Sequence, residues 1–342
     1  MALVIAGSEV LGSRANPFGE WGSLAHSQAR RPWARLVARR GPATVTAVLV
    51  LVSSCLGFAA TQRSTPLLIL GLVGVAVLTV FGYLAGKRSS DPQTPGWRMA
   101  GLLEEDSAFF AAQVGHFVTS DAVDDEWWSA FRQQSAAQHR VLLEGTRTAG
   151  QAGADLVVWA EGAGLIAAAD HPEALDATVQ VARSTATYVV ASWLVLDRDT
   201  ALMDNVCTVI DPAGEVVLTR AKRFPVPGVE SDRTLTRPQH DLQAVDTPFG
   251  RLTVLICFDA DHAESWRQVI RCGADVVAIP ASGWPQIGFL HADMALLRAR
   301  STAVAIIRPA RGGVSVVATA RGDVIAQQDH QHHNTPALLG AL

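Results

Sequence analysis

The chain has 342 residues, which leaves room for one large domain of about 250 residues and an additional module. Its formal net charge is -4 and its pI is about 6.2, so no basic surface dominates and a nucleic-acid partner is excluded. The four cysteines form no CxxC pair and show no zinc-ligand spacing; a Cys257 to Cys272 pair is left open.

The first part of the chain is predicted to lie in or on a membrane. Residues 43–60 and 66–85 are uncharged apolar runs, each about long enough to cross a ~30 Å hydrocarbon core as a helix. We therefore predict two transmembrane helices over 43–86, with Gly71 and Gly74 allowing close contact. Two buried helices of a soluble protein are the alternative. Residues 1–42, apolar at the start and rich in arginine before the first run, are predicted to be a partial membrane or interfacial segment.

Residues 87–96 form a polar, Pro-rich linker, residues 97–328 are the predicted soluble domain, and residues 329–342 are expected to be a tail. Within the domain, helices alternate with hairpin-connected strands, which predicts an α/β layered sandwich with parallel and antiparallel pairs. Helices are expected over 126–151, 172–185, 264–271 and 291–302. Strands are expected over 97–103, 154–159, 188–196, 202–210, 216–220, 251–256, 276–279, 305–308, 314–319 and 324–328.

Cys257 lies where the predicted strand 251–256 gives way to a helix. At such a turn we expect the side chain to be exposed at the sheet edge, with helix N–H groups lowering the pKa of the thiol. This is a position typical of a nucleophile. The alternative is a small buried residue that ends a strand.

Glu161 and Lys222 also follow predicted strands, so a carboxylate, an ammonium and a thiol are expected to converge. Lys87 is the other lysine of a chain whose remaining basic residues are arginine. The chemistry of each side chain suggests its role. Cys257 attacks a carbonyl or nitrile carbon, Glu161 accepts the thiol proton and later returns a proton to the leaving group, and Lys222 stabilises the developing oxyanion. This mechanism needs no metal and no cofactor. The cluster Asp-His-Gln-His-His over 329–333 is typical of a solvated terminus rather than a metal site.

In this order, the three residues resemble the catalytic Glu, Lys and Cys of the carbon–nitrogen hydrolase (nitrilase) superfamily. The surrounding segments are similar too: Val-Val-Trp-Ala-Glu over 157–161, the Lys-to-Glu loop over 222–230, Ile-Cys-Phe-Asp over 256–259, and Ser-Gly-Trp over 282–284. The resemblance implies a nitrilase-like α-β-β-α sandwich. It also implies supporting roles for Glu230, Phe258, Asp259 and Trp284.

Within that superfamily, residues 7–11 and 16–28 and the two spans resemble the later membrane helices of apolipoprotein N-acyltransferases. This resemblance implies an acyltransferase of lipoprotein biosynthesis in the cell membrane. Cys257 would take a fatty acyl group from a phospholipid as a thioester and pass it to the amino group of a lipoprotein. Membrane anchoring makes the search for embedded substrates local.

The chain also departs from the family pattern, with Phe258 where Tyr is usual, Asp259 where Glu is usual and a short connection from Lys222 to Cys257. A membrane-tethered amidase or nitrilase that hydrolyses small amides, or a degenerate non-catalytic relative, therefore remain alternatives. The resemblance places the catalytic domain on the extracytoplasmic side, which we adopt. The arginines before the first span and Lys87 favour the cytoplasmic side by the positive-inside rule.

Overall fold

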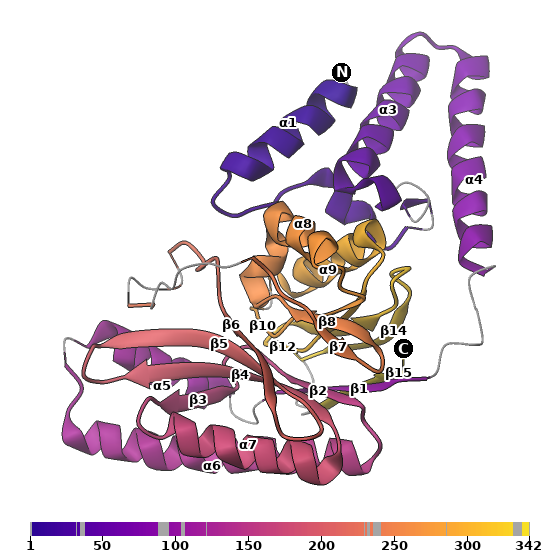
Figure 1. The fold of residues 1–342 in the computed structure, drawn as a ribbon. Coiled ribbons are helices and arrows are strands. Elements are labelled where there is room, and N and C mark those ends of the chain that lie inside the picture. The colour runs from indigo at the N-terminus through magenta and orange to yellow at the C-terminus, as the bar shows by residue number, and fades with distance from the viewer. Residues whose placement is uncertain are drawn as a thin grey trace.

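The computed structural model describes residues 2–31, 33–34, 38–87, 96–103, 107–120, 122–228, 230, 233–234, 241–284, 286–330 and 337–341. Helices α1 (Ala2–Ala15), α3 (Pro42–Thr61) and α4 (Thr65–Lys87) lie together at one end of the molecule, away from the strands (Figure 1). Most of the predicted linker 87–96 lies outside the described residues. The segment between α1 and α3 contains the short turns η1 (Leu24–Gln28) and η2 (Ala38–Arg40).

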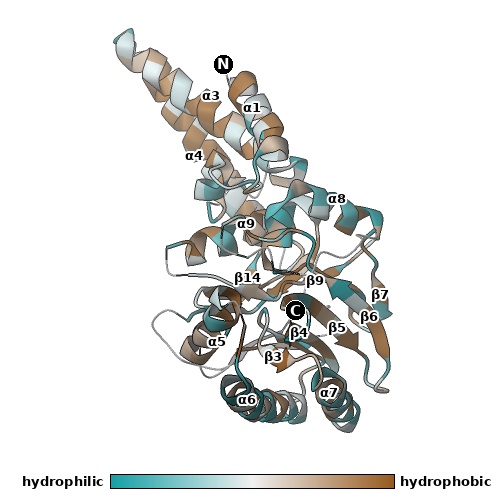
Figure 2. Cartoon of the chain, turned by 90° about the vertical axis from the view of Figure 1, so that its left-hand side faces the viewer, coloured by the Kyte–Doolittle hydropathy of each residue, from teal (hydrophilic) through white to brown (hydrophobic). Residues whose placement is uncertain are grey.

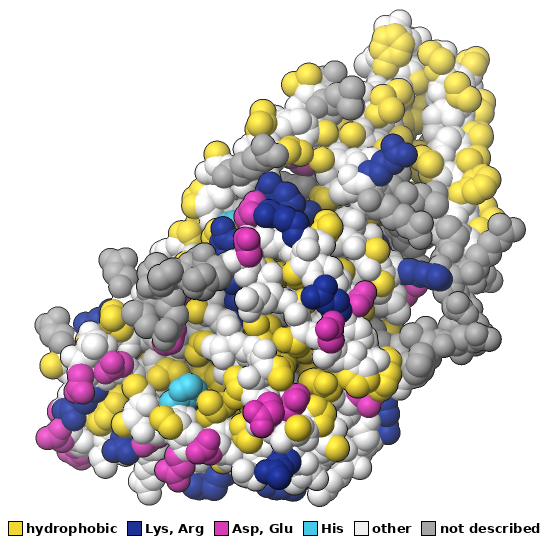
Figure 3. Space-filling view, in the orientation of Figure 1, with side chains coloured by type: hydrophobic (Ala, Val, Ile, Leu, Met, Phe, Trp, Pro, Cys, Tyr) yellow, Lys and Arg dark blue, Asp and Glu magenta, His cyan; other side chains and the backbone are white. Residues whose placement is uncertain are grey.

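Helices α3 and α4 are long and apolar enough to cross a membrane. In the most apolar 18-residue stretch of each helix, only 17% and 6% of the residues, respectively, are buried in the protein. Apolar residues predominate along both helices (Figure 2), and hydrophobic side chains cover much of their visible surface (Figure 3). A pair of core helices in a soluble protein would instead bury these side chains. Gly71 lies against the Leu56 side chain of the partner helix, as predicted, whereas Gly74 has open space around it and makes no such contact.

The remaining described residues form two mixed sheets and a separate parallel pair of β10 (Ala281–Ser282) with β12 (Ala310–Arg311). Within the described residues, the first has the strand order β15-β1-β2-β4-β5-β6, with β3 beside β4, and the second has the order β14-β13-β11-β9-β8-β7. The first sheet contains β1 (Arg98–Leu102), β2 (Leu156–Trp159), β3 (Gly164–Ala167), β4 (Tyr188–Asp197), β5 (Leu202–Ile210), β6 (Val216–Ala221) and β15 (Ala337–Ala341). The second contains β7 (Val245–Thr247), β8 (Gly250–Val254), β9 (Val276–Ala278), β11 (Ala305–Arg308), β13 (Val314–Ala318) and β14 (Val324–Asp329).

The two sheets pack face to face and are covered by helices on both outer sides. Alternate residues of neighbouring strands, such as Leu156 and Val158 of β2 and Val254 of β8, fill the layer between the sheets. Helices α6 (Asp125–Gln151) and α7 (His171–Thr185) cover the first sheet, and α8 (Ala263–Arg271) and α9 (Gly288–Thr302) cover the second (Figure 1). The expected α-β-β-α sandwich is confirmed.

Local sequence explains where α6 begins and which face it buries. The side chain of Asp124 accepts a hydrogen bond from the N–H of Trp127, which caps the first turn, and Asp125 and Glu126 follow at the positive end of the helix. Its buried residues recur every three or four positions, so one face packs on the first sheet. They are Phe131, Ser135, His139, Leu142, Thr146 and Ala149.

One predicted boundary was wrong, one helix was not predicted, and one segment makes contacts that were not expected. The supposed tail 329–342 contributes β15, which pairs antiparallel with β1 from Arg98↔Ala341 to Leu102↔Ala337, because a short apolar run can complete a sheet edge. Helix α5 (Ser107–Thr119) was missed, since its uncharged sequence gives no amphipathic pattern. The segment 1–42 does more than border the membrane: its alanines, among them Ala25 and Ala29, pack with Leu297 of α9.

Candidate active site

Cys257 begins the 3-10 turn η3 (Cys257–Asp261), which joins the end of β8 to α8. Its φ of +47° is in the left-handed region, which non-glycine residues rarely adopt and which costs of the order of 1 kcal/mol or more. The N–H of Cys257 donates to the carbonyl of Pro280 at 2.7 Å, and its thiol donates to the carbonyl of Ser282 at 3.2 Å. The turn is thus held by the strand next to it, and the thiol has a defined direction.

Asp259 ties this turn to the segment that follows Lys222. Its carboxylate accepts hydrogen bonds from the N–H groups of Arg223 at 3.0 Å and Phe224 at 2.8 Å, and from Ile256 at 3.2 Å. Burial raises the pKa of Asp259 to about 6. The shorter carboxylate therefore reaches its partners, and it connects two of the predicted catalytic positions through the backbone.

Glu161 and Lys222 form a buried ion pair. Lys222 Nζ donates to Glu161 Oε1 at 2.8 Å and to Glu230 Oε1 at 2.7 Å, and the Lys222 side chain is 2% exposed. Asn205 of β5 donates to the same Glu161 oxygen at 2.9 Å. One ammonium thus lies between two carboxylates, in the arrangement that the strand ends predicted for Glu161 and Lys222.

Opposite charges in this cluster shift one another's pKa values. Burial alone would raise the pKa of Glu161, but the Lys222 ammonium and hydrogen bonds from Lys222, Asn205 and Cys257 lower it overall. Burial opposes the charge on Lys222, yet the charges of Glu161, Cys257 and Glu230 raise its pKa. Glu161 and Lys222 are therefore both charged at neutral pH.

The prediction that helix N–H groups make Cys257 an exposed, acidic thiol was wrong. Cys257 is 7% exposed, and burial followed by the charge of Glu161 raises the pKa of its thiol. The strand end is covered by other parts of the fold, so desolvation outweighs the effect of a single short turn. The cysteine is a neutral thiol beside an ionised carboxylate, an arrangement in which the carboxylate can accept the thiol proton.

These residues line one cavity of about 200 Å³. Glu161, Lys222 and Cys257 are joined there by Glu230, Asn205, Ser282 and Trp284, and an apolar stripe of α5 forms another wall. The stripe consists of Phe110, Val114 and Val118 of α5. The side chains of Leu194, Met203 and Val226 extend this apolar wall. The cavity therefore has a charged, reactive part and a hydrocarbon-lined part.

The four predicted supporting residues have different places. Glu230 contacts Lys222 and Trp284 lines the cavity, whereas Phe258 and Asp259 are buried and are not among the described residues that line it. The sequence did not identify Asn205 as a site residue, because a polar residue within a largely apolar strand was all that distinguished it. Nor did the sequence identify Arg311, whose guanidinium carbon lies 3.2 Å from the ring centre of Phe110 and whose Nη2 donates to the Glu161 carbonyl at 2.9 Å.

In the part of the chain that the structure describes, no group of three or more His, Cys, Asp and Glu side chains is placed to hold a metal ion. Residues 331–333 of the 329–333 cluster lie outside that part. Cys257 and Cys272 are both free thiols, so the pair that the sequence left open is not formed.

Residues 122–335 match the family profile described as carbon-nitrogen hydrolase, which is more than half of the chain. The chain belongs to the carbon–nitrogen hydrolase family. It is also similar to an apolipoprotein N-acyltransferase of Geobacter metallireducens, at 24% identity over 220 residues, which is 58% of this chain and 42% of that protein. The matched part thus spans less than half the length of this curated relative.

Solved structures of an amidase from Nesterenkonia sp. have a similar fold. One such crystal structure has a TM-score of 0.56 at 16% identity and covers 72% of this chain and 90% of the amidase. A mutant that carries the acetamide moiety of fluoroacetamide on its active-site cysteine has a TM-score of 0.57 at 17% identity, over 73% of this chain and 92% of the other. This level of likeness shows the shared nitrilase fold.

Proposed function

We propose that this carbon–nitrogen hydrolase relative is a membrane-anchored acyltransferase in which Glu161, Lys222 and Cys257 form the catalytic triad. The observation that carries the proposal is the cavity itself, where the three residues meet beside a hydrocarbon-lined wall. The domain is attached to two helices long and apolar enough to cross a membrane. A reactive thiol, an apolar acyl site and a membrane anchor together fit a lipid acyl donor.

In the first half of the reaction, Cys257 attacks the carbonyl carbon of an ester. Glu161 accepts the thiol proton as the carbon–sulfur bond forms, and Lys222 stabilises the negative charge on the carbonyl oxygen. Collapse of the tetrahedral intermediate breaks the carbon–oxygen bond, and Glu161 returns the proton to the departing alcohol. The product is an acyl thioester on Cys257 and a free lyso-lipid.

In the second half, an amine attacks the thioester carbon. Glu161 takes a proton from the attacking nitrogen, Lys222 again holds the oxyanion, and the carbon–sulfur bond breaks as Glu161 returns a proton to the cysteine sulfur. The enzyme ends in its starting state with an amide as product. Glu230 accepts a hydrogen bond from Lys222 at 2.7 Å and helps to keep the ammonium in place.

The two apolar helices and the similar N-acyltransferase support a proposal for the substrates. We propose a phospholipid as acyl donor and the amino terminus of a lipoprotein as acceptor, in the cell membrane with the catalytic domain on the extracytoplasmic side. Arg30, one of the arginines that favour the opposite orientation, pairs with Asp293 of α9 at 2.6 Å. The ion pair with the catalytic domain gives Arg30 a role that does not depend on the orientation of the chain in the membrane. A reporter joined to Leu342 through a flexible spacer, and active in only one compartment, tests the orientation.

A membrane-tethered amidase is the second candidate, because a cavity of about 200 Å³ suits a small amide and the similar solved structures are amidases. It would use the same residues, with water in place of the amine. The two functions differ in what reaches Cys257 and in what removes the acyl group.

The decisive experiment incubates the purified full-length protein with phospholipid labelled in its acyl chains. Acyl transfer predicts a hydroxylamine-labile label on the peptide that contains Cys257, which a lipopeptide amine then discharges, and no label on a Cys257→Ala variant. Absence of label from phospholipid, with turnover of simple amides, would refute the acyltransferase and support the amidase.

A further inference from the structure

The segment between α1 and η1 reaches the turn that carries Cys257. The N–H of Glu20 donates to the backbone oxygen of Asp261, the last residue of η3, at 3.0 Å. Gly19 lies so close to this oxygen that a Cβ atom would come within 2.4 Å of it. Only glycine allows this approach, because its φ is also +62°. Residues 16–23, here called the docking loop, thus contact η3 through the backbone.

Trp21 extends this contact toward the reactive cysteine. Its indole Nε1 donates to Asp261 Oδ2 at 2.8 Å. Its ring is 5.9 Å from that of Phe258, edge to face, and 6.1 Å from that of Trp284, measured between ring centres. Phe258 follows Cys257 directly, and Trp284 lines the active-site cavity. One indole therefore contacts the far end of η3, the residue next to the nucleophile and a wall of the cavity.

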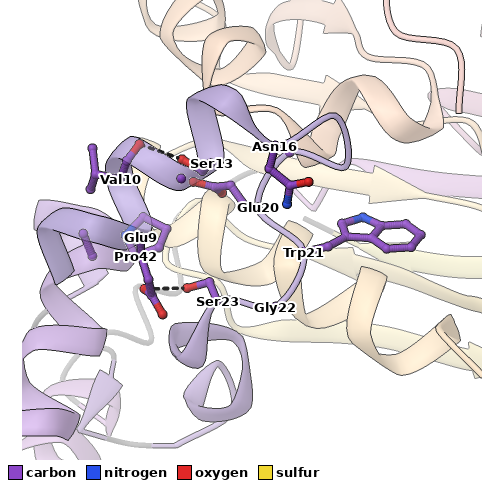
Figure 4. A pocket seen from close by; sticks show the side chains of 12 residues that line it. Glu9, Val10, Ser13, Asn16, Glu20, Trp21, Gly22, Ser23 and Pro42 are labelled. Carbon is purple, nitrogen blue, oxygen red and sulfur yellow. Dashed lines mark hydrogen bonds between the residues drawn. The ribbon is translucent and has the colours of Figure 1, made fainter. Parts of the chain in front are cut away.

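The docking loop is itself held at two places. Arg298 of α9 pairs with Glu20, with Arg298 Nε 2.8 Å from Glu20 Oε2. On the other side, Glu9 of α1 accepts hydrogen bonds from Ser23 Oγ at 3.0 Å and from Thr46 Oγ1 of α3 at 2.6 Å. Figure 4 shows Glu9 bonded to Ser23, with the Trp21 ring turned away from Glu9. The loop thus connects the helices near the membrane with η3.

We propose that Trp21 is a positioning residue that holds the η3 turn, through its hydrogen bond to Asp261, in the arrangement that places Cys257 against Glu161. Docking of this loop is then a condition for a reactive cysteine. The inference rests on Cys257 being the reacting thiol, as proposed above. It does not depend on the nature of the acyl donor.

The surroundings of Asp261 supply a readout that packing alone would not change. His291 Nε2 of α9 lies 3.3 Å from Asp261 Oδ2, and the charges of Arg308, Glu20 and Lys222 also act on Asp261. Burial raises the pKa of Asp261 to about 7, while the hydrogen bond from Trp21 favours the ionised form. Burial also lowers the pKa of His291 to about 3, so this ring is neutral near pH 7. Loss of the indole donor should therefore move the ionisation of Asp261 to higher pH.

The test measures alkylation of Cys257 by iodoacetamide in the full-length protein, from pH 5.5 to 9, with the modified peptide quantified by mass spectrometry. Trp21→Phe keeps an aromatic ring and removes the N–H. We expect alkylation at pH 7 to fall about tenfold or more, as for loss of a hydrogen bond to a charged group. The inflection near pH 7 should move upward. Trp33→Phe is the matched control, because Trp33 lies outside the docking loop and packs against alanines of the segment 1–42. The pH profile of alkylation in this variant should match the wild type.

An unchanged rate and pH profile in Trp21→Phe would overturn the proposal, and so would an equal loss in Trp33→Phe, which would indicate general loosening of the segment. If Trp21→Phe does not fold, Asp261→Asn serves instead, since it keeps an oxygen acceptor for the indole and removes the ionisation. It should keep the alkylation rate at pH 7 within a few-fold and lose the inflection; a retained inflection would contradict the proposal. Normal alkylation without acylation by phospholipid would refute only the acyltransferase function.

Discussion

Replacing Lys222 by methionine tests whether the buried cation holds two carboxylates in place. Lys222 bonds Glu161 at 2.8 Å and Glu230 at 2.7 Å, and its side chain is almost fully buried. Removing one partner of a buried ion pair costs about 3–5 kcal/mol, because a charge is left without compensation. In a domain of this size, that loss lowers the melting temperature by roughly 6–20 °C. Acylation of Cys257 should be lost as well, since the oxyanion has no cation.

The destabilisation caused by Lys222→Met should depend on pH. Without Lys222, the pKa values of Glu161 and Glu230 in the folded protein rise above those of the unfolded chain. An acid with a raised folded pKa destabilises the protein as pH rises from the unfolded pKa through the folded one. The stability difference between Lys222→Met and the wild type should therefore be largest near pH 8 and shrink toward pH 5.

Thermal unfolding of the detergent-solubilised protein at both pH values measures the effect. The double variant Glu161→Gln with Lys222→Met is the matched control, because it removes both charges of the Glu161–Lys222 pair and should recover part of the lost stability. A loss below about 1 kcal/mol in Lys222→Met, or a deficit that does not depend on pH, would refute the reasoning.

Three further predictions concern single positions. Cys257→Ala should abolish the acyl label while changing the melting temperature little, because the side chain loses only its sulfur; a labelled variant would place the thioester elsewhere. The pKa of Asp261 in the folded protein, about 7, exceeds its usual value, so the free energy of unfolding should decline as pH rises from about 4 to 7. Asp261→Asn should flatten this decline. Urea unfolding at pH 5 and 8 measures it, and an equal change of unfolding free energy with pH in the variant and the wild type would contradict the prediction. Val114→Phe should favour shorter acyl chains, because Val114 lines the apolar wall; equal rates across chain lengths would exclude that wall as the acyl site.

Features with local causes were predicted well from the sequence. The hairpin of β5 and β6 was expected at 202–210 and 216–220, because the turn Asp211–Gly214 between them is encoded by its own residues. The convergence of Glu161 and Lys222 followed from their positions at strand ends, since such ends meet at one edge of a sheet.

Features that depend on distant parts of the chain were not predicted. The burial of Cys257 comes from elements that cover the strand end, so its pKa shift is opposite to the one a strand-to-helix turn favours. The hydrogen bond from Trp21 to Asp261 joins residues 240 positions apart. Helix α5, whose apolar stripe lines the cavity, has no alternation of polar and apolar residues that would have identified it.

The pairing of β15 with β1 gives the end of the chain an importance for expression and storage of the protein. Strand β1 follows shortly after the apolar helix α4, and β15 covers its outer edge (Figure 1). Cutting the chain before Ala337 would leave those backbone groups of residues 98–102 that face β15 unpaired at a sheet edge, which is a template for aggregation. Carboxy-terminal tags therefore need a flexible spacer, and proteolytic trimming at this end should show first as loss of solubility rather than as loss of a catalytic group.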